Sequence, residues 1–247
     1  MLYGICPLSV VAVRAEPSDA SEMVTQLLYG DHFEVIENKL KWIKIRIAFD
    51  DYEGWLDVKQ AFEIDETTYE NLNTTRSFST DLLSLMTTKH GHLMPVCIGS
   101  SIEASKLLGH KFDGANNHNF SKRDLVDTAM LYLNSPYLWG GKSPFGIDCS
   151  GFVQMVYKIS GIHLFRDAYE QAKQGQALSF IEESEPGDLA FFDNEEGKII
   201  HVGIMMKENY IIHAHGQVRI DRIDHSGIFN VDTNRYSHNL RVIKKVV

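Results

Sequence analysis

A cysteine and two histidines downstream of it are the residues of this sequence whose types and spacing best suit nucleophilic catalysis. Cys149 follows the turn residues Gly146 and Asp148, and apolar residues then recur at helical spacing from Phe152 to Tyr157. A cysteine attacks a carbonyl as the thiolate, and its pKa falls at a helix N-terminus and beside a histidine. Free cysteines are also common as inert core residues. Spacing alone therefore leaves a catalytic and a structural role open for Cys149.

The two histidines are expected on neighbouring strands. His201 begins an alternating run that continues to Ile204, and His213 follows the apolar residues Ile211 and Ile212. A nucleophile, a base and a third group that orients the base form the general triad arrangement. One histidine in a strand is more often a hydrogen-bonded core residue. Two of them, after a cysteine that opens a helix, favour catalysis.

The elements that must position these residues follow an α+β pattern. Helices are predicted from residue 121, where Ser121 would be the N-cap, to the stop at residues 134–136, over residues 149–160, and over residues 167–174. Gly161 and Gly175 end the second and third helices. Strand-like runs follow at residues 188–192, 199–206, 210–215 and 240–243. Helices first and an antiparallel sheet afterwards predict an α+β domain over residues 119–247.

The N-terminal residues 1–65 read instead as short strands between turn signals. The runs lie at residues 9–13, 26–28, 32–36, 41–45 and 54–58, and regular short strands of this kind predict a small β-barrel. Residues 66–118 have no clear period, because Thr, Asn and Gly residues interrupt every apolar run. That segment is either a second, divergent barrel unit or a β-rich connector, with a strand pair beginning near Met94.

The motifs around the three chemical residues resemble a known family. The sequences Asp-Cys-Ser-Gly-Phe at 148–152, His-Val-Gly-Ile at 201–204 and Ile-His-Ala at 212–214 occur in the order and at the intervals of the NlpC family of papain-like peptidoglycan peptidases. Pro-Tyr-Leu-Trp-Gly-Gly at 136–141 and Glu-Pro-Gly-Asp-Leu at 185–189 are similar to that family as well. The pattern of residues 13–56 resembles bacterial SH3-like domains that accompany cell-wall enzymes.

The resemblance implies a role for each residue of the catalytic motifs. Cys149 would be the nucleophile, His201 the base and His213 the residue that orients the base. His215 competes with His213, because residues two apart on a strand point to the same face. A histidine in the third position should stabilise the imidazolium less than a carboxylate would. The backbone N–H of Cys149 and the Tyr137 hydroxyl are expected to hold the oxyanion.

The resemblance also implies a substrate. Members with SH3-like domains in front resemble γ-D-glutamyl-L-diamino acid endopeptidases, which act on murein peptides with a free N-terminal L-Ala. Asp148 is expected to bind the ammonium group, although an aspartate at this position is also a routine N-cap. Ser150 would add a hydrogen bond, and Glu22, Tyr52 and Trp139 would line the pocket around the alanine. In this interpretation the N-terminal barrel closes the binding pocket.

Composition limits the classes of binding partner and the cellular compartment that can be expected. The chain has 247 residues, 44% hydrophobic, and a net charge of −9, with no basic run interleaved with aromatics, so nucleic acid is not an expected partner. No apolar run is long enough to span a membrane, and no export signal is recognisable. Three scattered cysteines indicate a reducing setting. A cytoplasmic enzyme of murein peptide recycling is the expectation, or an exported one if the native N-terminus was trimmed, with no cofactor.

Three other interpretations of the same residues stay open. The protein could be another papain-like amidase or acyltransferase, or a non-catalytic module that binds wall peptides. A metal site formed by His201, His213 and His215 is a third possibility, which the absence of an accompanying carboxylate or cysteine at ligand spacing disfavours.

Overall fold

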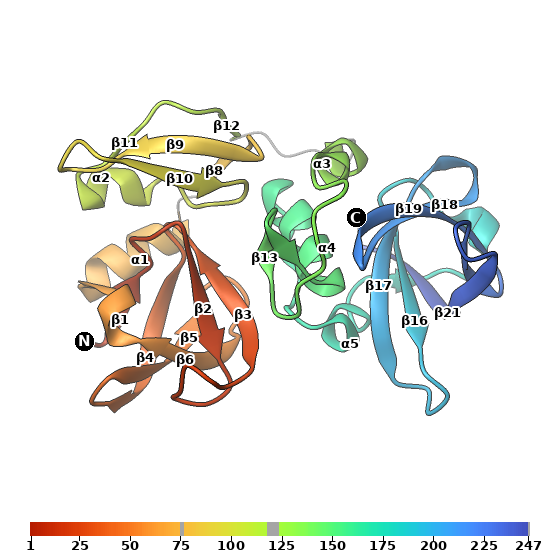
Figure 1. The fold of residues 1–247 in the computed structure, drawn as a ribbon, viewed down its shortest axis with the longest axis horizontal. Coiled ribbons are helices and arrows are strands. Elements are labelled where there is room, and N and C mark those ends of the chain that lie inside the picture. The colour runs from red at the N-terminus through yellow and green to blue at the C-terminus, as the bar shows by residue number, and fades with distance from the viewer. Residues whose placement is uncertain (75–76, 118–123, 247) are drawn as a thin grey trace. The chain divides into compact units, whose positions relative to one another are not determined.

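The computed structural model describes residues 1–74, 77–117 and 124–246, and its chain divides into two compact units. Unit 1 contains Met1–Asn119 and Trp139–Pro144, and unit 2 contains Phe120–Leu138 and Phe145–Val247. Figure 1 shows unit 1 from red to yellow-green and most of unit 2 from green to blue. The predicted boundary at residues 118–119 and the predicted N-cap Ser121 lie outside the described residues.

Unit 1 begins with a seven-stranded antiparallel sheet in the order β3-β2-β6-β5-β4-β1-β7. Its strands are β1 (Tyr3–Ile5), β2 (Val10–Arg14), β3 (Met23–Leu28), β4 (His32–Lys39), β5 (Trp42–Ile47), β6 (Glu53–Asp57) and β7 (Phe62–Ile64), with the 3-10 turn η1 (Val58–Gln60) between the last two. The strand β5 alternates half-buried and buried residues, as the sequence predicts. The buried faces enclose an apolar core that includes Val13, Leu27 and Ile45.

The second part of unit 1 contains both helices and strands. Its elements are α1 (Glu66–Thr74), β8 (Phe78–Ser79), β9 (Leu83–Thr87), β10 (Leu93–Cys97), α2 (Ala104–Leu108), β11 (Lys111–Phe112) and β12 (Asn116–Asn117). The strands form a three-stranded sheet β10-β9-β11 and a two-stranded sheet β12-β8. Met86 and Val96 share a core with Ile5 and Tyr29 of the first part. Within the described residues, therefore, this segment packs on the barrel and forms one unit with it.

A short segment from later in the chain, residues 139–144, also belongs to unit 1. The backbone N–H of Lys142, which begins β13 (Lys142–Ser143), donates to Gln26 Oε1 at 2.7 Å in a buried position. Gly140 has a φ of +75°, and a Cβ there would collide with the backbone of Met23. Only glycine combines this conformation with this close approach.

The helices of unit 2 are α3 (Leu125–Leu131), α4 (Cys149–Ile159) and α5 (Ala168–Gln171), and the short strand β14 (Gly146–Ile147) precedes α4. The predicted helix over residues 149–160 is present as α4, with Asp148 as its N-cap and Gly161 in the left-handed conformation just past its end. The first and third helices are shorter than predicted. The chain turns after Leu131, and Gln171 is followed by turns that reach Gly175.

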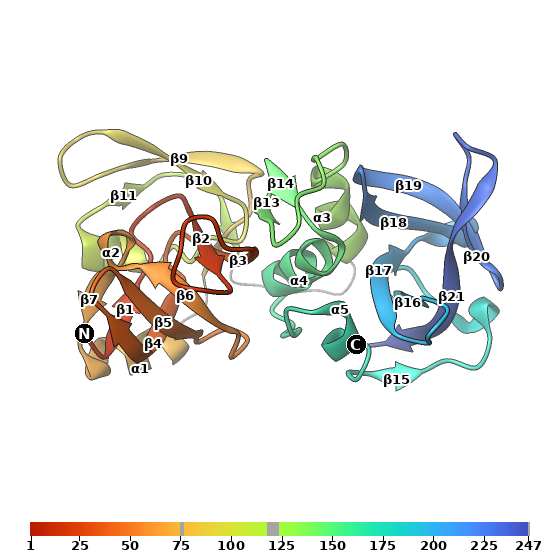
Figure 2. The ribbon, with the colours of Figure 1, turned by 60° about the horizontal axis from the view of Figure 1, so that its bottom comes forward.

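The strands of unit 2 that follow α5 form a sheet that closes on itself. They are β15 (Gln176–Ala177), β16 (Leu189–Asp193), β17 (Ile199–Met205), β18 (Tyr210–His215), β19 (Gln217–Asp224), β20 (Gly227–Asn230) and β21 (Arg235–Lys245), with the 3-10 turns η3 (Ile181–Glu183) and η4 (Lys207–Asn209). Each strand from β16 to β20 pairs with the next, and β21 pairs with both β20 and β16. Figure 2 shows the resulting antiparallel ring from cyan to blue. The sequence did not predict β19 and β20, so the closure was missed.

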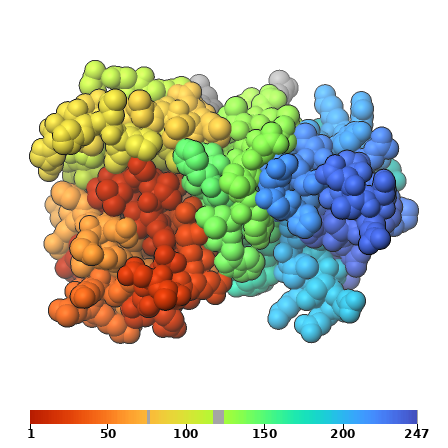
Figure 3. Space-filling view, viewed as in Figure 1, coloured from red at the N-terminus to blue at the C-terminus, as the bar shows by residue number. Residues whose placement is uncertain are grey.

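The two faces of this sheet have different neighbours. Helix α4 packs against β17 and β18 (Figures 1 and 2). Inside the ring lies an apolar core that includes Phe192, Met205, Ile211 and Ile223. The spaces between the ribbons of this unit are filled by side chains, as the space-filling view in Figure 3 shows for one face. No helix of the described residues is long and apolar enough to cross a membrane.

Candidate active site

Cys149 is the first residue of α4 and lies against β17. Asp148, the N-cap, accepts a hydrogen bond of 2.7 Å from the backbone N–H of Gly151, which fixes the start of the helix. The Cys149 side chain is buried, and the backbone N–H of Val202 donates toward its thiol. Val202 follows His201 in β17, so the predicted nucleophile lies against the strand that carries the predicted base.

The resting thiol is neutral, contrary to the sequence-based expectation of a lowered pKa. Burial raises the pKa of Cys149 to about 12, and the charge of Asp148 adds to the rise. The N–H groups of Val202 and Ser150 oppose it. A carboxylate next to the thiol therefore offsets the benefit of the helix N-terminus. A thiolate forms here only when the proton passes to a neighbouring base.

His201 and His213 lie on adjacent strands and are joined by a hydrogen bond. His201 Nε2 and His213 Nδ1 are 2.8 Å apart, and both rings are buried. Gly203 lies directly opposite His213 in the β17–β18 register. A Cβ at position 203 would lie 2.9 Å from His213 Cβ, so the missing side chain leaves room for His213 to reach across to His201. His215, the predicted competitor, is exposed, and its ring centroid lies 6.5 Å from that of His201.

Asp221 extends this chain of hydrogen bonds, and the sequence interpretation missed it. Its Oδ2 lies 3.1 Å from His213 Nε2, and its side chain is fully buried. Arg219 donates to both carboxylate oxygens at 2.7 and 2.9 Å. The signal was present in the sequence, because a hairpin around Gly216 pairs His213 with Arg219 and places Asp221 one pair further along the same face. The third position is thus a histidine supported by a carboxylate.

The chain of hydrogen bonds fixes the tautomers. A carboxylate only accepts, so His213 carries its proton on Nε2 and presents Nδ1 as an acceptor. His201 must then carry its proton on Nε2, which leaves Nδ1 as its unprotonated nitrogen. Burial, followed by the neighbouring histidines, holds the pKa of His201 well below its usual value. Cys149 and His201 therefore rest as a neutral thiol and a neutral imidazole.

A fourth histidine, His238 of β21, lies face to face with His201. The two ring centroids are 4.1 Å apart with an interplanar angle of 20°. The ligand nitrogens of His201, His213 and His238 lie within 4.8 Å of one another, so these three, and not the predicted set with His215, are the possible metal ligands among the described residues. Stacked rings direct their lone pairs nearly parallel, whereas zinc ligands must converge on one point. The arrangement fits a stack better than a metal site.

Tyr137 lies close to the nucleophile. Burial is the largest cause of the raised pKa of its phenol, and the nearby Cys149 and Asp148 add to the rise. The backbone N–H of Tyr137 donates to Gly216 O at 2.9 Å, which ties this segment to the β18–β19 turn. The phenol stays protonated, so it is available to donate a hydrogen bond. Its role at the oxyanion stays a prediction.

Asp148 and Ser150 form a buried cluster with Arg166. Arg166 donates to Asp148 Oδ1 at 3.0 Å and to Oδ2 at 2.6 Å, and to Ser150 Oγ at 3.0 Å. Ser150 Oγ lies 3.3 Å from Asp148 Oδ1, which also accepts from Gly151. An N-cap and an ion pair therefore explain Asp148 without any substrate. The predicted contact with an ammonium group stays a prediction.

The remaining predicted site residues all lie in unit 1. Trp139 Nε1 donates to Glu22 Oε1 at 2.6 Å, so the structure brings these two predicted residues together. The Trp139 side chain is exposed. Tyr52 is half-buried against the barrel core, and its carbonyl accepts from the backbone N–H of Ile47 at 3.0 Å.

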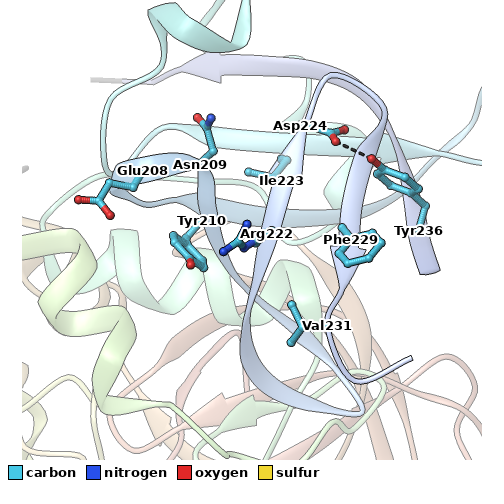
Figure 4. Close-up of a pocket in the computed structure, with 9 residues that line it drawn as sticks. All are labelled: Glu208, Asn209, Tyr210, Arg222, Ile223, Asp224, Phe229, Val231 and Tyr236. Carbon is cyan, nitrogen blue, oxygen red and sulfur yellow. Dashed lines mark hydrogen bonds between the residues drawn. The ribbon is translucent and has the colours of Figure 1, made fainter. Parts of the chain in front are cut away.

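A separate pocket of about 720 Å³ opens in unit 2, on η4 and the strands β18–β21 (Figure 4). Arg222 faces the ring of Tyr210, and Tyr236 donates its hydroxyl to Asp224 at 2.5 Å. None of the residues predicted for catalysis or substrate binding lines it. The chemistry of this pocket is distinct from the Cys149 cluster.

Comparison with known proteins defines the two domains. The NlpC/P60 family matches residues 134–235, and the bacterial dipeptidyl-peptidase Sh3 domain matches residues 13–60. The chain therefore carries an NlpC/P60 domain preceded by a bacterial dipeptidyl-peptidase Sh3 domain, which confirms the resemblance drawn from the motifs.

Two similar proteins are named as dipeptidyl-peptidases. A gamma-D-glutamyl-L-lysine dipeptidyl-peptidase of Bacillus cereus is 29% identical over 80% of this chain and 68% of that protein. Dipeptidyl-peptidase 6 of Lysinibacillus sphaericus is 29% identical over 85% of this chain and 88% of that protein. The crystal structure of an NlpC/P60 family protein from Bacillus cereus has a TM-score of 0.79 over 99% of both chains at 19% identity, and so shares the fold.

Proposed function

We propose that this protein is a cysteine peptidase with Cys149 as nucleophile and His201 as base. The observation that supports this most directly is the hydrogen-bond chain from His201 through His213 to Asp221, which starts on the strand against which Cys149 lies at the start of α4. His213 and Asp221 act through His201 and are positioning residues.

The neutral resting pair determines the first step. As Sγ of Cys149 bonds to the carbonyl carbon, its proton moves to Nδ1 of His201, and the C=O π pair moves onto oxygen. Collapse of the tetrahedral intermediate breaks the C–N bond, and the imidazolium gives its proton to the leaving amine. Water then attacks the thioester with His201 again as base, which releases the acid and restores the thiol. Asp221 stabilises the transient imidazolium through His213.

The oxyanion is proposed to accept from the backbone N–H of Cys149 and the hydroxyl of Tyr137. Helix N-termini leave such N–H groups without a partner inside the helix. The Tyr137→Phe variant should fold normally and lose about tenfold or more in kcat, since one oxyanion donor contributes up to 10²–10³. An unchanged kcat would remove Tyr137 from the mechanism.

The proposed substrate is a murein peptide cleaved between D-Glu and the L-diamino acid, with a free N-terminal L-Ala. The names of the Bacillus and Lysinibacillus relatives support this class of bond. We assign the free amino group to the predicted carboxylates Asp148 and Glu22, of which Asp148 pairs with Arg166 and Glu22 accepts from Trp139 Nε1. The bond cleaved is an amide, so an amidase or acyltransferase remains the alternative.

The test uses L-Ala-γ-D-Glu-L-Lys and its diaminopimelate analogue, each with a free and an acetylated L-Ala. Release of the diamino acid by the wild-type chain, and its loss in Cys149→Ala, is the expected result. Intact peptides would contradict the peptidase assignment and favour an amidase or a binding module. Equal cleavage of acetylated peptides would contradict only the free-amino requirement. Activity that survives in EDTA separates thiol from metal catalysis.

We further propose that the physiological substrates are released peptides in the cytoplasm, where they would be recycled. A requirement for free L-Ala supports this, because the L-Ala of intact wall is bonded to sugar. Digestion of intact sacculi at a rate comparable with free tripeptide would contradict it.

A further inference from the structure

The stack of His238 on His201 has no part in the proposed proton path. His238 comes from β21, and its ring lies over the face of the His201 ring with centroids 4.1 Å apart and planes tilted by 20°. It meets His213 edge-on at 5.9 Å. Ser237 Oγ lies 2.9 Å from His238 Nδ1 and fixes the orientation of the ring.

A base in this position needs more than its one hydrogen bond to stay oriented. The χ2 torsion of histidine has broad, roughly two-fold minima, so a ring held at one nitrogen can still rotate. Rotation would carry Nδ1 away from the thiol and break the 2.8 Å contact with His213. A flat group against the ring face opposes this rotation and also keeps water from the hydrogen bond.

We propose that His238 is a positioning residue that holds the His201 ring by stacking on it. The inference rests on the proposed role of His201 as the base. Stacking also suits the charge that develops during the reaction, because a neutral aromatic face stabilises a cation placed over it.

His238 is neutral under working conditions, so it presents such a face. Burial lowers the pKa of His238 to about 3, and His213 and His215 add to the effect. The ionisable groups around the stack come from two strands: His213 and His215 of β18, which lower the pKa of His238, and Asp221 of β19, which raises it.

Three substitutions separate stacking from the other things a histidine can do. Phe is flat but has no ring nitrogen, Leu fills the volume without a flat face, and Ala removes both. We expect His238→Phe to keep kcat within about threefold, whereas His238→Leu and His238→Ala should lose about ten- to a hundredfold in kcat with KM unchanged. His225→Ala, an exposed histidine of the β19–β20 turn, is the matched control and should behave as wild type.

The pH profile provides a second readout, because it reports the burial of the His201 ring and not the stability of the fold. Burial lowers the pKa of His201 from its ordinary value of 6.5, so the imidazole stays unprotonated in solutions of lower pH than a free histidine would. Uncovering the ring raises that pKa, and activity is then lost at a higher pH as the solution is acidified. The acid limb of kcat should therefore move upward in His238→Ala and stay in place in His238→Phe.

Two results would overturn the proposal: His238→Ala with a kcat within twofold of wild type, or His238→Phe losing as much as His238→Ala. If the Ala variant does not fold, the comparison of Phe with Leu decides in the same way. An inactive wild-type chain, or an active Cys149→Ala variant, would instead contradict the proposed function. These results differ from the two above, so a failure of the peptidase assignment can be told apart from a failure of the stacking role.

Discussion

At the scale of single residues, the proposed nucleophile and base form a neutral pair, whereas the sequence predicted a lowered pKa for the cysteine. The helix N-terminus favours a Cys149 thiolate, but burial and the adjoining Asp148 charge raise its pKa to about 12. His201 is also neutral in the resting site, because burial and three neighbouring histidines lower its pKa. In the proposed mechanism, charge separation is therefore delayed until the substrate carbonyl is attacked. Asp221 then becomes important, since it is the anion at the end of the hydrogen-bond chain.

Replacing Asp221 with Asn should disturb the tautomers more than the fold. An amide can donate to His213 Nε2, which would move the His213 proton to Nδ1. Two N–H groups, His213 Nδ1 and His201 Nε2, would then face each other and could not form a hydrogen bond. We expect kcat to fall by about 10²-fold, less than the roughly 10⁴-fold loss for an aspartate bonded directly to the base. Steady-state kinetics and the melting temperature measure the two effects separately.

Asp232→Asn is the control, because Asp232 pairs with the same Arg219 from an exposed position. Its kcat should match wild type. A kcat in Asp221→Asn that also matches wild type would show that His213 orients the base without the carboxylate.

At the scale of the elements, a glycine and an ion pair hold the site together. Gly203 allows β17 and β18 to approach with His213 turned toward His201. The Asp148–Arg166 pair ties the start of α4 to the segment before α5. Both features serve the position of the site, and each can be altered without removing a proposed catalytic residue.

The Gly203→Ala variant should lose much of its kcat while its stability changes little. Its new Cβ would lie 2.9 Å from His213 Cβ, closer than real Cβ contacts allow, so His213 must shift and its hydrogen bond to His201 lengthen. We expect at least a tenfold fall in kcat. Gly4→Ala, which meets the ring of Phe33 at 2.6 Å in unit 1, is a matched control that should lower stability and leave kcat unchanged. Equal loss of kcat in both variants would contradict the argument.

Arg166→Met should destabilise unit 2. Both partners are almost fully buried, and a buried carboxylate left without its cation costs about 3–5 kcal/mol. Urea unfolding followed by far-UV circular dichroism, which follows α4, measures this loss. Arg46→Met, from an exposed pair with Glu53, should leave stability nearly unchanged. All three tryptophans lie in unit 1, so the unfolding curve followed by their fluorescence should change little in Arg166→Met.

The sequence predicted the elements whose pattern is local and missed those that depend on distant pairing. Helix α4 and strands β16–β18 follow from apolar spacing with clear ends. The strand β19 alternates apolar and charged residues, but its Arg and Asp side chains obscured the pattern, and Asp221 was missed with it. His238 gave no local signal, because it reaches His201 only through the pairing of β21 with both β20 and β16.

At the scale of the whole molecule, the net charge of −9 acts on any charged substrate. The proposed tripeptide is neutral overall when it ends in L-Lys, since two ammonium groups balance two carboxylates. With diaminopimelate it carries one further carboxylate and a net charge of −1. The net charge of the chain should therefore repel the diaminopimelate peptide and have no net effect on the Lys peptide.

This repulsion predicts a different salt dependence for the two peptides. A unit charge about 25 Å from a charge of −9 meets roughly 1.5 kcal/mol of repulsion in water before screening. The Debye length falls from about 30 Å at 0.01 M salt to about 8 Å at 0.15 M, which removes most of it. Over that range kcat/KM should rise about threefold for the diaminopimelate peptide and stay constant for the Lys peptide. Parallel curves for the two peptides would mean that local charges, such as the ion pair of Arg166 with Asp148, outweigh the field of the molecule at the site.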